Sequence, residues 1–323
     1  MKKKCDIIIP VYNAPEWVSL CIEAINISDQ SNVINKIIII DDCSNSETKE
    51  LLRELEKKNK KVFCIHNEQN LGFVKSCNKG LALSNSDYIM LLNSDCLLAY
   101  DTTCRLINIL ENYRDVGLIS PLSNNAANLS VSIPDNANYL QVDKLLYQLS
   151  DVFYPACTIT GNCLVISRSC YEVVGGLDEA FGMGYGEETD YQFRAAQAGF
   201  KSIIAGNAYV FHKSQVSFGN NDVLNQRKKR NRDLFFDRWG DEYYRLLKEY
   251  EKNDPALIAQ QYLYRKHNEI LRTEISPFSK EFIKMVAEVD CQKNVSEFEN
   301  NVAWYKSCKK ILKRVITLLK NNR

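Results

Sequence analysis

The chain has 323 residues, of which 45% are hydrophobic and 25% are charged, and this globular composition excludes a largely disordered protein. No apolar run approaches the roughly 20 residues that a membrane span needs, and the apolar start of the chain ends at Pro10, so a secretory signal is not expected. Residues 1–220 carry 19 Lys and Arg against 25 Asp and Glu, whereas residues 221–323 carry 22 against 15, which predicts a domain boundary near residue 220.

Short apolar runs alternate with amphipathic stretches over the first 120 residues. The apolar runs predict strands and the amphipathic stretches predict helices, because their hydrophobic periods differ. Strands are expected at 6–10, 36–40, 62–65, 87–92 and 117–120, with helices at 16–27, 46–58, 72–83 and 102–112. This alternation predicts an α/β protein with a parallel sheet, whose ligand would bind beyond the carboxyl ends of the strands.

The second half of the chain is less regular. Residues 121–155 are rich in Asn and predict a long loop that contacts the substrate. A strand at 158–167, a glycine-rich mobile loop at 175–186, a helix at 187–199 and a last strand at 201–212 are expected next. From residue 222 onward the pattern is helical, with breaks at Asp254-Pro255 and Ser276-Pro277, which predicts a helical C-terminal extension over 221–323.

Acidic side chains follow two of the expected strands. Asp42 follows the second strand and either accepts a hydrogen bond from a ribose or base, or caps the next helix. Asn93, Ser94 and Asp95 follow the fourth strand, where a carboxylate suits a hard divalent cation. An ordinary Asn/Asp turn is the alternative for this tripeptide taken alone.

Two later positions are candidates for catalysis and metal binding. Glu187, Glu188 and Asp190 crowd the start of a helix, where they either stabilise its N-terminus or include a general base with a raised pKa. Glu187 and Asp190 share one helix face, so Glu188 is expected to point into the cleft. His212 ends the last strand and is either a structural histidine or a metal ligand through neutral imidazole.

The order of these motifs resembles that of family 2 glycosyltransferases with the GT-A fold, over roughly residues 5–220. The matching segments are 7–13 (Ile-Ile-Ile-Pro-Val-Tyr-Asn), 40–44 (Ile-Asp-Asp-Cys-Ser), 70–73 (Asn-Leu-Gly-Phe) with Asn78 and Gly80, 92–95 (Leu-Asn-Ser-Asp), 161–163 (Gly-Asn-Cys), 175–190, and His212. The run at 120–125 (Ser-Pro-Leu-Ser-Asn-Asn) is similar to bacterial members that build surface polysaccharide. The resemblance implies a mostly parallel central sheet flanked by helices, with residues 1–220 as the nucleotide-sugar-binding catalytic domain.

The resemblance also implies roles for individual residues. Asp95 would be the metal-bound acid and His212 would complete a site for Mg²⁺ or Mn²⁺, while Asn93 stands where the family motif usually has its first Asp. Glu188 stands where the family has its catalytic Asp and would be the base, with Glu187 as the alternative. The side chains expected around the nucleotide-sugar are Pro10, Tyr12, Asp42, Asn70, Gly72, Lys75, Asn78, Asn93 and Ser94.

The implied reaction transfers a sugar with inversion from a nucleotide-sugar, UDP- or dTDP-linked, to a hydroxyl of a glycan or lipid-linked acceptor in cell-surface polysaccharide synthesis. A non-catalytic nucleotide- or sugar-binding module is the alternative, but it would not need Glu188, Asp95 and His212 together. A dinucleotide-dependent oxidoreductase would require a Gly-x-Gly-x-x-Gly turn after the first strand, where residues 10–15 contain no glycine. Nucleic-acid binding is not expected, because the first 220 residues are net acidic.

The C-terminal part adds basic segments with open interpretations. Residues 226–232 (Gln-Arg-Lys-Lys-Arg-Asn-Arg) either face phosphates of the donor or of a lipid-diphosphate acceptor, or form a solvated helix face. Residues 303–323 predict a basic amphipathic helix that either lies on an anionic membrane surface or packs on the catalytic domain or a second subunit. The twelve cysteines include no Cys-x-x-Cys pair, which favours reduced thiols and a cytoplasmic protein. If residues 303–323 contact a membrane, the protein is expected at the inner face of the cell membrane.

Overall fold

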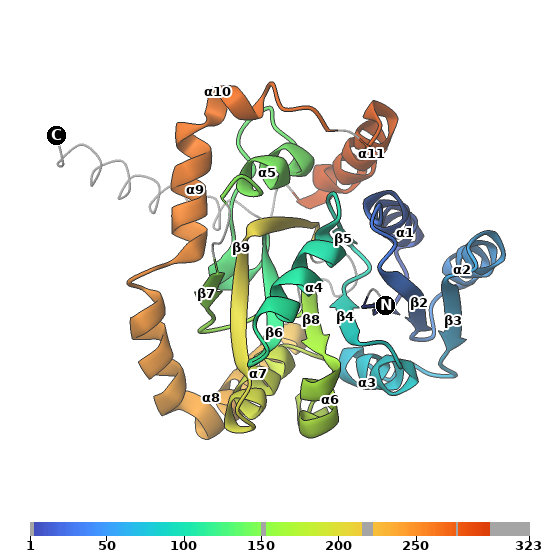
Figure 1. The fold of residues 1–323 in the computed structure, drawn as a ribbon. Coiled ribbons are helices and arrows are strands. Elements are labelled where there is room, and N and C mark those ends of the chain that lie inside the picture. Colours follow the sequence, from blue (N-terminus) through green and yellow to red (C-terminus); the bar gives the residue numbers. More distant parts are fainter. Residues whose placement is uncertain (1–2, 150–152, 215–221, 276, 298–323) are drawn as a thin grey trace. The chain divides into compact units, whose positions relative to one another are not determined.

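A computed structural model describes residues 3–149, 153–214, 222–275 and 277–297 (Figure 1). The chain divides into two compact units, residues 1–278 and 279–323. The described part of the second unit is one helix, α11, Lys280–Glu297. The predicted boundary near residue 220 and the predicted amphipathic helix at 303–323 lie outside the described residues.

The first unit is built on one sheet with helices packed against it. Its strands are β1 (Cys5–Val11), β2 (Ile34–Asp41), β3 (Val62–His66), β4 (Tyr88–Leu92), β5 (Cys96–Leu97), β6 (Val116–Ser123), β7 (Phe153–Pro155), β8 (Cys163–Ser167) and β9 (Lys201–His212). Among the described residues, the strand order is β3-β2-β1-β4-β8-β6-β9-β5, with β7 paired to β9. The α/β fold with a helical C-terminal part is confirmed.

The helices of the first unit follow most of the predicted ranges. They are α1 (Pro15–Ser28), α2 (Ser46–Lys58), α3 (Phe73–Leu83), α4 (Thr102–Asn112), α5 (Tyr139–Leu146), α6 (Arg168–Val174), α7 (Glu187–Gln197), α8 (Asp222–Tyr250), α9 (Pro255–Arg265) and α10 (His267–Ile270), with 3₁₀ turns η1 (Ala127–Leu129) and η2 (Glu179–Phe181). The prediction of a loop over 121–155 missed α5, which begins at a capping box formed by Asn138 and Gln141. Asn favours helix N-caps as well as turns, so an Asn-rich composition does not distinguish the start of α5 from a loop.

The direction of the strands changes at β8. Strands β3, β2, β1 and β4 pair in parallel, as the alternation predicted, but β8 runs antiparallel between β4 and β6. The pairing sets Leu92 opposite Cys163, so the start of β8 lies beside the end of β4. The backbone N–H of Asn93 then donates to the Asn162 carbonyl, 2.9 Å away. This reversal brings the predicted 161–163 motif next to the predicted metal motif.

The sheet core is made of isoleucine-rich strands buried on both faces. Ile7 and Ile9 on β1 pair in register with Ile37 and Ile39 on β2, and all four are at most 1% exposed. Such continuous apolar strands are typical of parallel sheets covered on both faces. Helix α3 packs on β1 and β2, and α5 and α9 pack on β9. In the part of the chain that the structure describes, no helix is both long and apolar enough to cross a membrane.

The close approach of α3 to β1 at Gly80 predicts that one added methyl group has a large effect on stability. A Cβ added at Gly80 on α3 would collide with Cγ2 of Ile8 on β1. We expect Gly80→Ala to lower the free energy of unfolding by about 1–3 kcal/mol, because an extra group in a packed core forces its neighbours to move. Chemical denaturation measured by circular dichroism tests this.

Gly240→Ala is the matched control, since a Cβ at this helical glycine of α8 meets Phe236 only at ordinary contact distance, 3.7 Å. It should leave stability unchanged or raise it by up to about 1 kcal/mol through helix propensity. Equal stability of the two variants would contradict the proposed close contact between α3 and β1.

Candidate active site

A cavity of about 320 Å³ lies at the edge of the sheet where β1, β2, β4, β6 and β9 end. Its volume lies within the range of sites for small organic ligands, and its position is where the sequence predicted a ligand. The predicted site residues that line it are Pro10, Tyr12, Asp42, Asn70, Gly72, Asn93, Ser94, Asp95, Glu187, Glu188 and His212. Residues from widely separated parts of the chain therefore meet in one hollow.

Lys75 and Asn78 are not among the residues that line the cavity, and their contact with the base and diphosphate stays a prediction. The Asn78 amide donates to the Leu177 carbonyl and accepts from the Leu177 N–H, at 2.9 and 2.8 Å. Lys75 is exposed and its ammonium lies 3.8 Å from the Glu179 carboxylate. Both side chains lie on the face of α3 that meets the glycine-rich segment, so they attach that segment to the helix.

Asp42 lines the cavity, but its carboxylate is largely engaged by the protein. Oδ1 accepts from Asn67 Nδ2 at 2.9 Å and from the Leu71 N–H at 2.7 Å, and Oδ2 accepts from the Gly72 N–H at 2.8 Å. These bonds hold the turn that opens α3. Gly72 adopts φ +85°, and a Cβ there would collide with Met183, so the turn accepts only glycine. Binding of the nucleoside by Asp42 stays a prediction.

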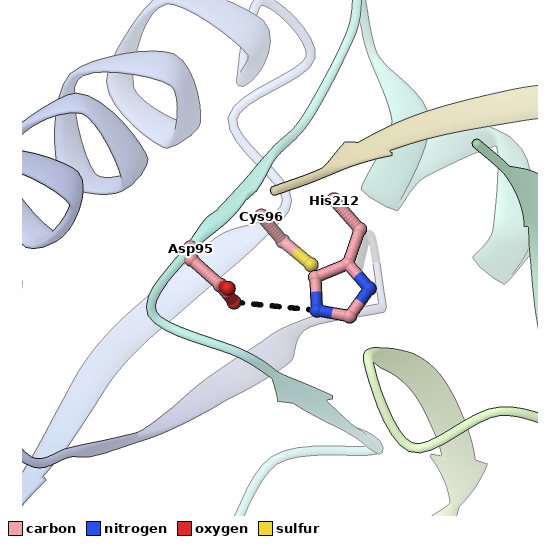
Figure 2. A group of neighbouring side chains, drawn as sticks. All are labelled: Asp95, Cys96 and His212. Carbon is pink, nitrogen blue, oxygen red and sulfur yellow. Dashed lines mark ion pairs between the residues drawn. The ribbon is translucent and has the colours of Figure 1, made fainter. Parts of the chain in front are cut away.

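Asp95, Cys96 and His212 form a compact cluster at the cavity (Figure 2). His212 Nε2 lies 3.4 Å from Asp95 Oδ1, and its Nδ1 lies 2.7 Å from the Asn125 carbonyl oxygen. Because a carbonyl only accepts, Nδ1 carries a proton, and Nε2 on the Asp95 side is the nitrogen that could bind a metal once it has lost its own proton. This is the arrangement of a histidine that is ready to bind a metal.

The polar groups around this cluster fit a divalent cation. The Asn93 Oδ1 atom is buried and has no hydrogen-bond partner among the described residues, and the Nδ2 atom of the same amide lies 3.4 Å from His212 Nε2. Cys96 Sγ lies 3.3 Å from the Asn162 carbonyl, and burial raises the pKa of this thiol well above its usual range. A carboxylate oxygen, an amide oxygen and an imidazole nitrogen suit Mg²⁺ or Mn²⁺, whereas a neutral thiol is a poor ligand.

The charge on His212 depends on opposing effects. Burial lowers the pKa of its imidazole, but the Asp95 carboxylate and the Asn125 carbonyl together raise that pKa by more, above 6.5. A bound cation would therefore displace a proton that Asp95 helps to hold.

Glu187 and Glu188 lie at the start of α7 in different environments. Glu187 is 3% exposed, and its Oε2 atom has no hydrogen-bond partner in the described part of the chain. Burial raises the pKa of Glu187 well above 4.5, and the neighbouring charge of Glu188 raises it further. Glu188 is half-buried, and burial raises its pKa as well. Burial therefore favours the protonated form of both carboxyls relative to an exposed glutamate, and more strongly for Glu187 than for Glu188.

Glu188 lies against Gly161, where an added Cβ would be 3.6–3.7 Å from its side chain. Its Oε2 accepts the Gly186 N–H at 3.3 Å. The 161–163 motif, to which the sequence analysis assigned no role, therefore forms the wall beside the acidic pair. Tyr185 also lines the cavity, and the Lys228 ammonium lies 4.6 Å from the centre of its ring. One charge of the basic segment 226–232 thus reaches a side chain of the cavity wall.

Asn124 and Asn125 were not predicted as site residues, yet both hold His212. Asn124 Oδ1 accepts the His212 N–H at 2.8 Å, and Asn124 Nδ2 donates to the His212 carbonyl at 2.9 Å. Asn125 Nδ2 donates to the same carbonyl at 2.7 Å. The only signal in the sequence was their place in the 120–125 run, because the parallel pairing of β6 with β9 that brings them to His212 is not local.

The family model described as glycosyl transferase family 2 matches residues 6–174. An uncharacterized glycosyltransferase of Methanocaldococcus jannaschii is 24% identical over 168 residues, which cover 50% of this chain and 58% of that protein. The putative teichuronic acid biosynthesis glycosyltransferase TuaG of Bacillus subtilis is 31% identical over 94 residues, covering 29% and 36%. The chain thus spans well under two thirds of the length of both relatives.

A solved structure has a similar fold. It is the mannosyltransferase PcManGT from Pyrobaculum calidifontis in complex with GDP-Man and Mn²⁺, with a TM-score of 0.58 at 14% identity, covering 100% of this chain and 87% of that one. Because the family model covers half of the chain and contains the strands that form one side of the cavity, the chain belongs to glycosyl transferase family 2.

Proposed function

We propose that this chain transfers a sugar from a nucleotide-sugar to a hydroxyl group of an acceptor, with inversion at the anomeric carbon. The observation that carries the proposal is the shared cavity, which is lined both by the Asp95–His212 pair and by Glu188. A transferase needs these two kinds of group together, one to bind the departing diphosphate and one to activate the acceptor. Membership of the family supports the same reaction.

Asp95, His212 and the Oδ1 atom of Asn93 would hold the cation, either Mg²⁺ or Mn²⁺. When bound, such a cation offsets the negative charge that a diphosphate gains as it leaves. The chain's own contribution is to orient the ligands. Asn125 fixes the imidazole of His212, and Asn124 fixes the backbone on which it is carried.

Glu188 would accept the proton of the acceptor hydroxyl as that oxygen attacks the sugar. We assign the carboxylate of the pair to Glu188, because burial and the charge of Glu188 raise the pKa of Glu187 well above its usual range. Its raised pKa also makes it a stronger base than an exposed glutamate. Tyr185 and Gly184 line the cavity beside it, so the loop they belong to would shield the reacting groups from water.

The donor and acceptor are proposed from chemistry and likeness. The similarity to a putative teichuronic acid biosynthesis enzyme supports a cell-surface polymer, glycan or lipid-linked, as the acceptor. The position of Lys228 over Tyr185 supports an acceptor or donor phosphate at the mouth of the cavity. The likeness to a structure with GDP-Man supports a nucleotide-sugar donor, and we propose a UDP- or dTDP-linked sugar from the resemblance.

The proposal predicts metal-dependent nucleotide binding. We expect nucleoside diphosphates to raise the melting temperature only together with Mn²⁺ or Mg²⁺, because the diphosphate would contact the cation at Asp95. Ligand at about 100 times its Kd should add roughly 2.7 kcal/mol of stability. A thermal-shift series with UDP, dTDP and GDP, each with and without metal, followed by the matching nucleotide-sugars, tests this.

The alternative is a non-catalytic nucleotide- or sugar-binding module. It would show the same thermal shifts but would release no nucleoside diphosphate from any nucleotide-sugar, with or without candidate acceptors. Binding that is equally strong in EDTA would contradict the metal site itself.

A further inference from the structure

Helix α8 lies beyond the segment that the family model matches, yet it contacts the loop that leads to Glu187 and Glu188. One face of the helix carries Leu224, Asn231 and Phe235, which are all buried. This spacing of seven and then four residues defines a single helix stripe. Asn231 is the polar residue of that stripe and is 0% exposed.

The Asn231 amide uses both of its N–H groups on the loop. Nδ2 donates to the Phe181 carbonyl and to the Gly184 carbonyl, each at 2.8 Å. Its Oδ1 atom lies 3.5 Å from the Arg230 guanidinium, which only donates, so the orientation of the amide is settled by its partners. Because both amide donors of buried Asn231 are used by the carbonyls of Phe181 and Gly184, the side chain holds these two carbonyls in a fixed arrangement.

The loop needs such support because its backbone is unusual. Gly182, Gly184 and Gly186 have φ of +60°, +111° and +98°, and Tyr185 between them has φ +80°. A tyrosine in this region is strained and stays there only where the surroundings hold it. Tyr185 and Glu188 both line the cavity, so the shape of the loop sets their positions.

A second set of bonds joins α8 to the far side of the acidic pair. Asp190, which is 0% exposed, accepts from Arg238 at 3.0 Å, from Trp239 Nε1 at 2.9 Å and from Arg194 at 2.9 Å. Arg238 also donates to Asp178 at 2.6 Å, at the start of the η2 turn. Helix α8 therefore fixes the segment 178–190 at both ends, and Asn231 fixes its middle.

We propose that Asn231 is a positioning residue for the transfer reaction, acting by holding the carbonyls of Phe181 and Gly184 so that Tyr185 and Glu188 face the cavity. It does not itself line the cavity. The inference rests on the proposed function for its catalytic consequence, but the anchoring of the loop is independent of any reaction.

The test replaces Asn231 by Asp, which keeps the size of the side chain and removes both donors. Asn225→Asp, at an exposed position on the same helix, is the control with the same change of charge. We expect Asn231→Asp to lower kcat for transfer by about a hundredfold, as a misplacement of about 1 Å does, with the KM for the donor changed by less than about threefold. Hydrolysis of the donor should rise relative to transfer.

Hydrogen–deuterium exchange supplies a readout that needs no activity. In Asn231→Asp the amides of 181–186 should exchange at least about tenfold faster, while those of β1 and β4 stay unchanged. Asn231→Ala removes the donors without adding charge and should show the same local increase in amide exchange. It serves as the test variant if Asn231→Asp does not fold. Exchange that rises equally everywhere, or unchanged kcat in folded protein, overturns the proposal. Failure of the wild-type chain to transfer any sugar would overturn the proposed function, while the local exchange would still decide the anchoring role.

Discussion

Glu188→Gln should lower the turnover of sugar transfer by about 10²–10⁴-fold while the nucleotide still binds with nearly unchanged affinity. The substitution keeps the size of the side chain and removes the carboxylate that would accept the acceptor's proton, and a positioned base contributes this much. Nucleotide binding should survive because the cation that would contact the diphosphate is proposed at Asp95 and His212, whereas Glu188 contacts Gly161. Release of nucleoside diphosphate and calorimetric titration measure the two quantities.

Glu187→Gln separates the two candidates for the base. Burial and the charge of Glu188 raise the pKa of Glu187 well above its usual range, so an amide there resembles the protonated acid that this raised pKa favours. We expect the Glu187→Gln variant to lose far less turnover than Glu188→Gln. Glu50→Gln, which changes an exposed acid on α2, is the neutral control. Full activity of Glu188→Gln with loss in Glu187→Gln would reverse the assignment.

The pH dependence of turnover gives a second measure of the same group. A general base acts only when it is deprotonated, and burial raises the pKa of Glu188 above 4.5. Turnover should therefore fall as the pH falls through that raised pKa, and the acidic limb should lie at higher pH than for an ordinary glutamate. Glu188→Asp should keep this limb, since a carboxylate remains, whereas Glu188→Gln should lose it.

Local patterns in the sequence predicted which residues end each strand. Asp42, Asp95 and His212 follow apolar runs at the carboxyl ends of β2, β4 and β9, and strand ends of one direction meet at one edge of a sheet. Their convergence at one cavity could therefore be predicted without knowing the strand order. The acidic start of α7 was recognised in the same way, from its composition.

Residues whose roles depend on packing could not be predicted in this way. Whether Asn78 faces the cavity or the 175–179 segment depends on how α3 rotates against the sheet, and Gly80 settles that by its contact with Ile8. Asn125 reaches His212 only because β6 pairs with β9. Asn231 lies in a basic stretch and is itself polar, so the sequence does not mark it as a member of the buried stripe of Leu224 and Phe235. In each case, a long-range contact, and not local propensity, decides the role.

Asp95→Ala should abolish the metal dependence of nucleotide binding. With Mn²⁺ present, the affinity of the wild-type chain for a nucleoside diphosphate should exceed that of the variant by more than about a hundredfold, since changes even to the outer shell of a metal site cost 10–100-fold. Without metal, the two should bind within about twofold of each other. Calorimetric titration of nucleotide in the presence and absence of Mn²⁺ measures both affinities.

The control for Asp95→Ala is Asp135→Ala, which removes an acid from an exposed position and should keep the full effect of Mn²⁺.

Asp95→Asn adds a sharper test, because it retains an oxygen near His212 Nε2 but lacks the negative charge. If the negative charge of Asp95 attracts the cation, Asp95→Asn should reduce the effect of Mn²⁺ on nucleotide affinity nearly as much as Asp95→Ala does. If the Asp95→Ala variant keeps its response to Mn²⁺, the cation binds elsewhere, and the cluster of Asp95, Asn93 and His212 has another purpose. A lost response that appears only together with a lower melting temperature in the absence of ligand would instead indicate a structural role for the Asp95–His212 pair.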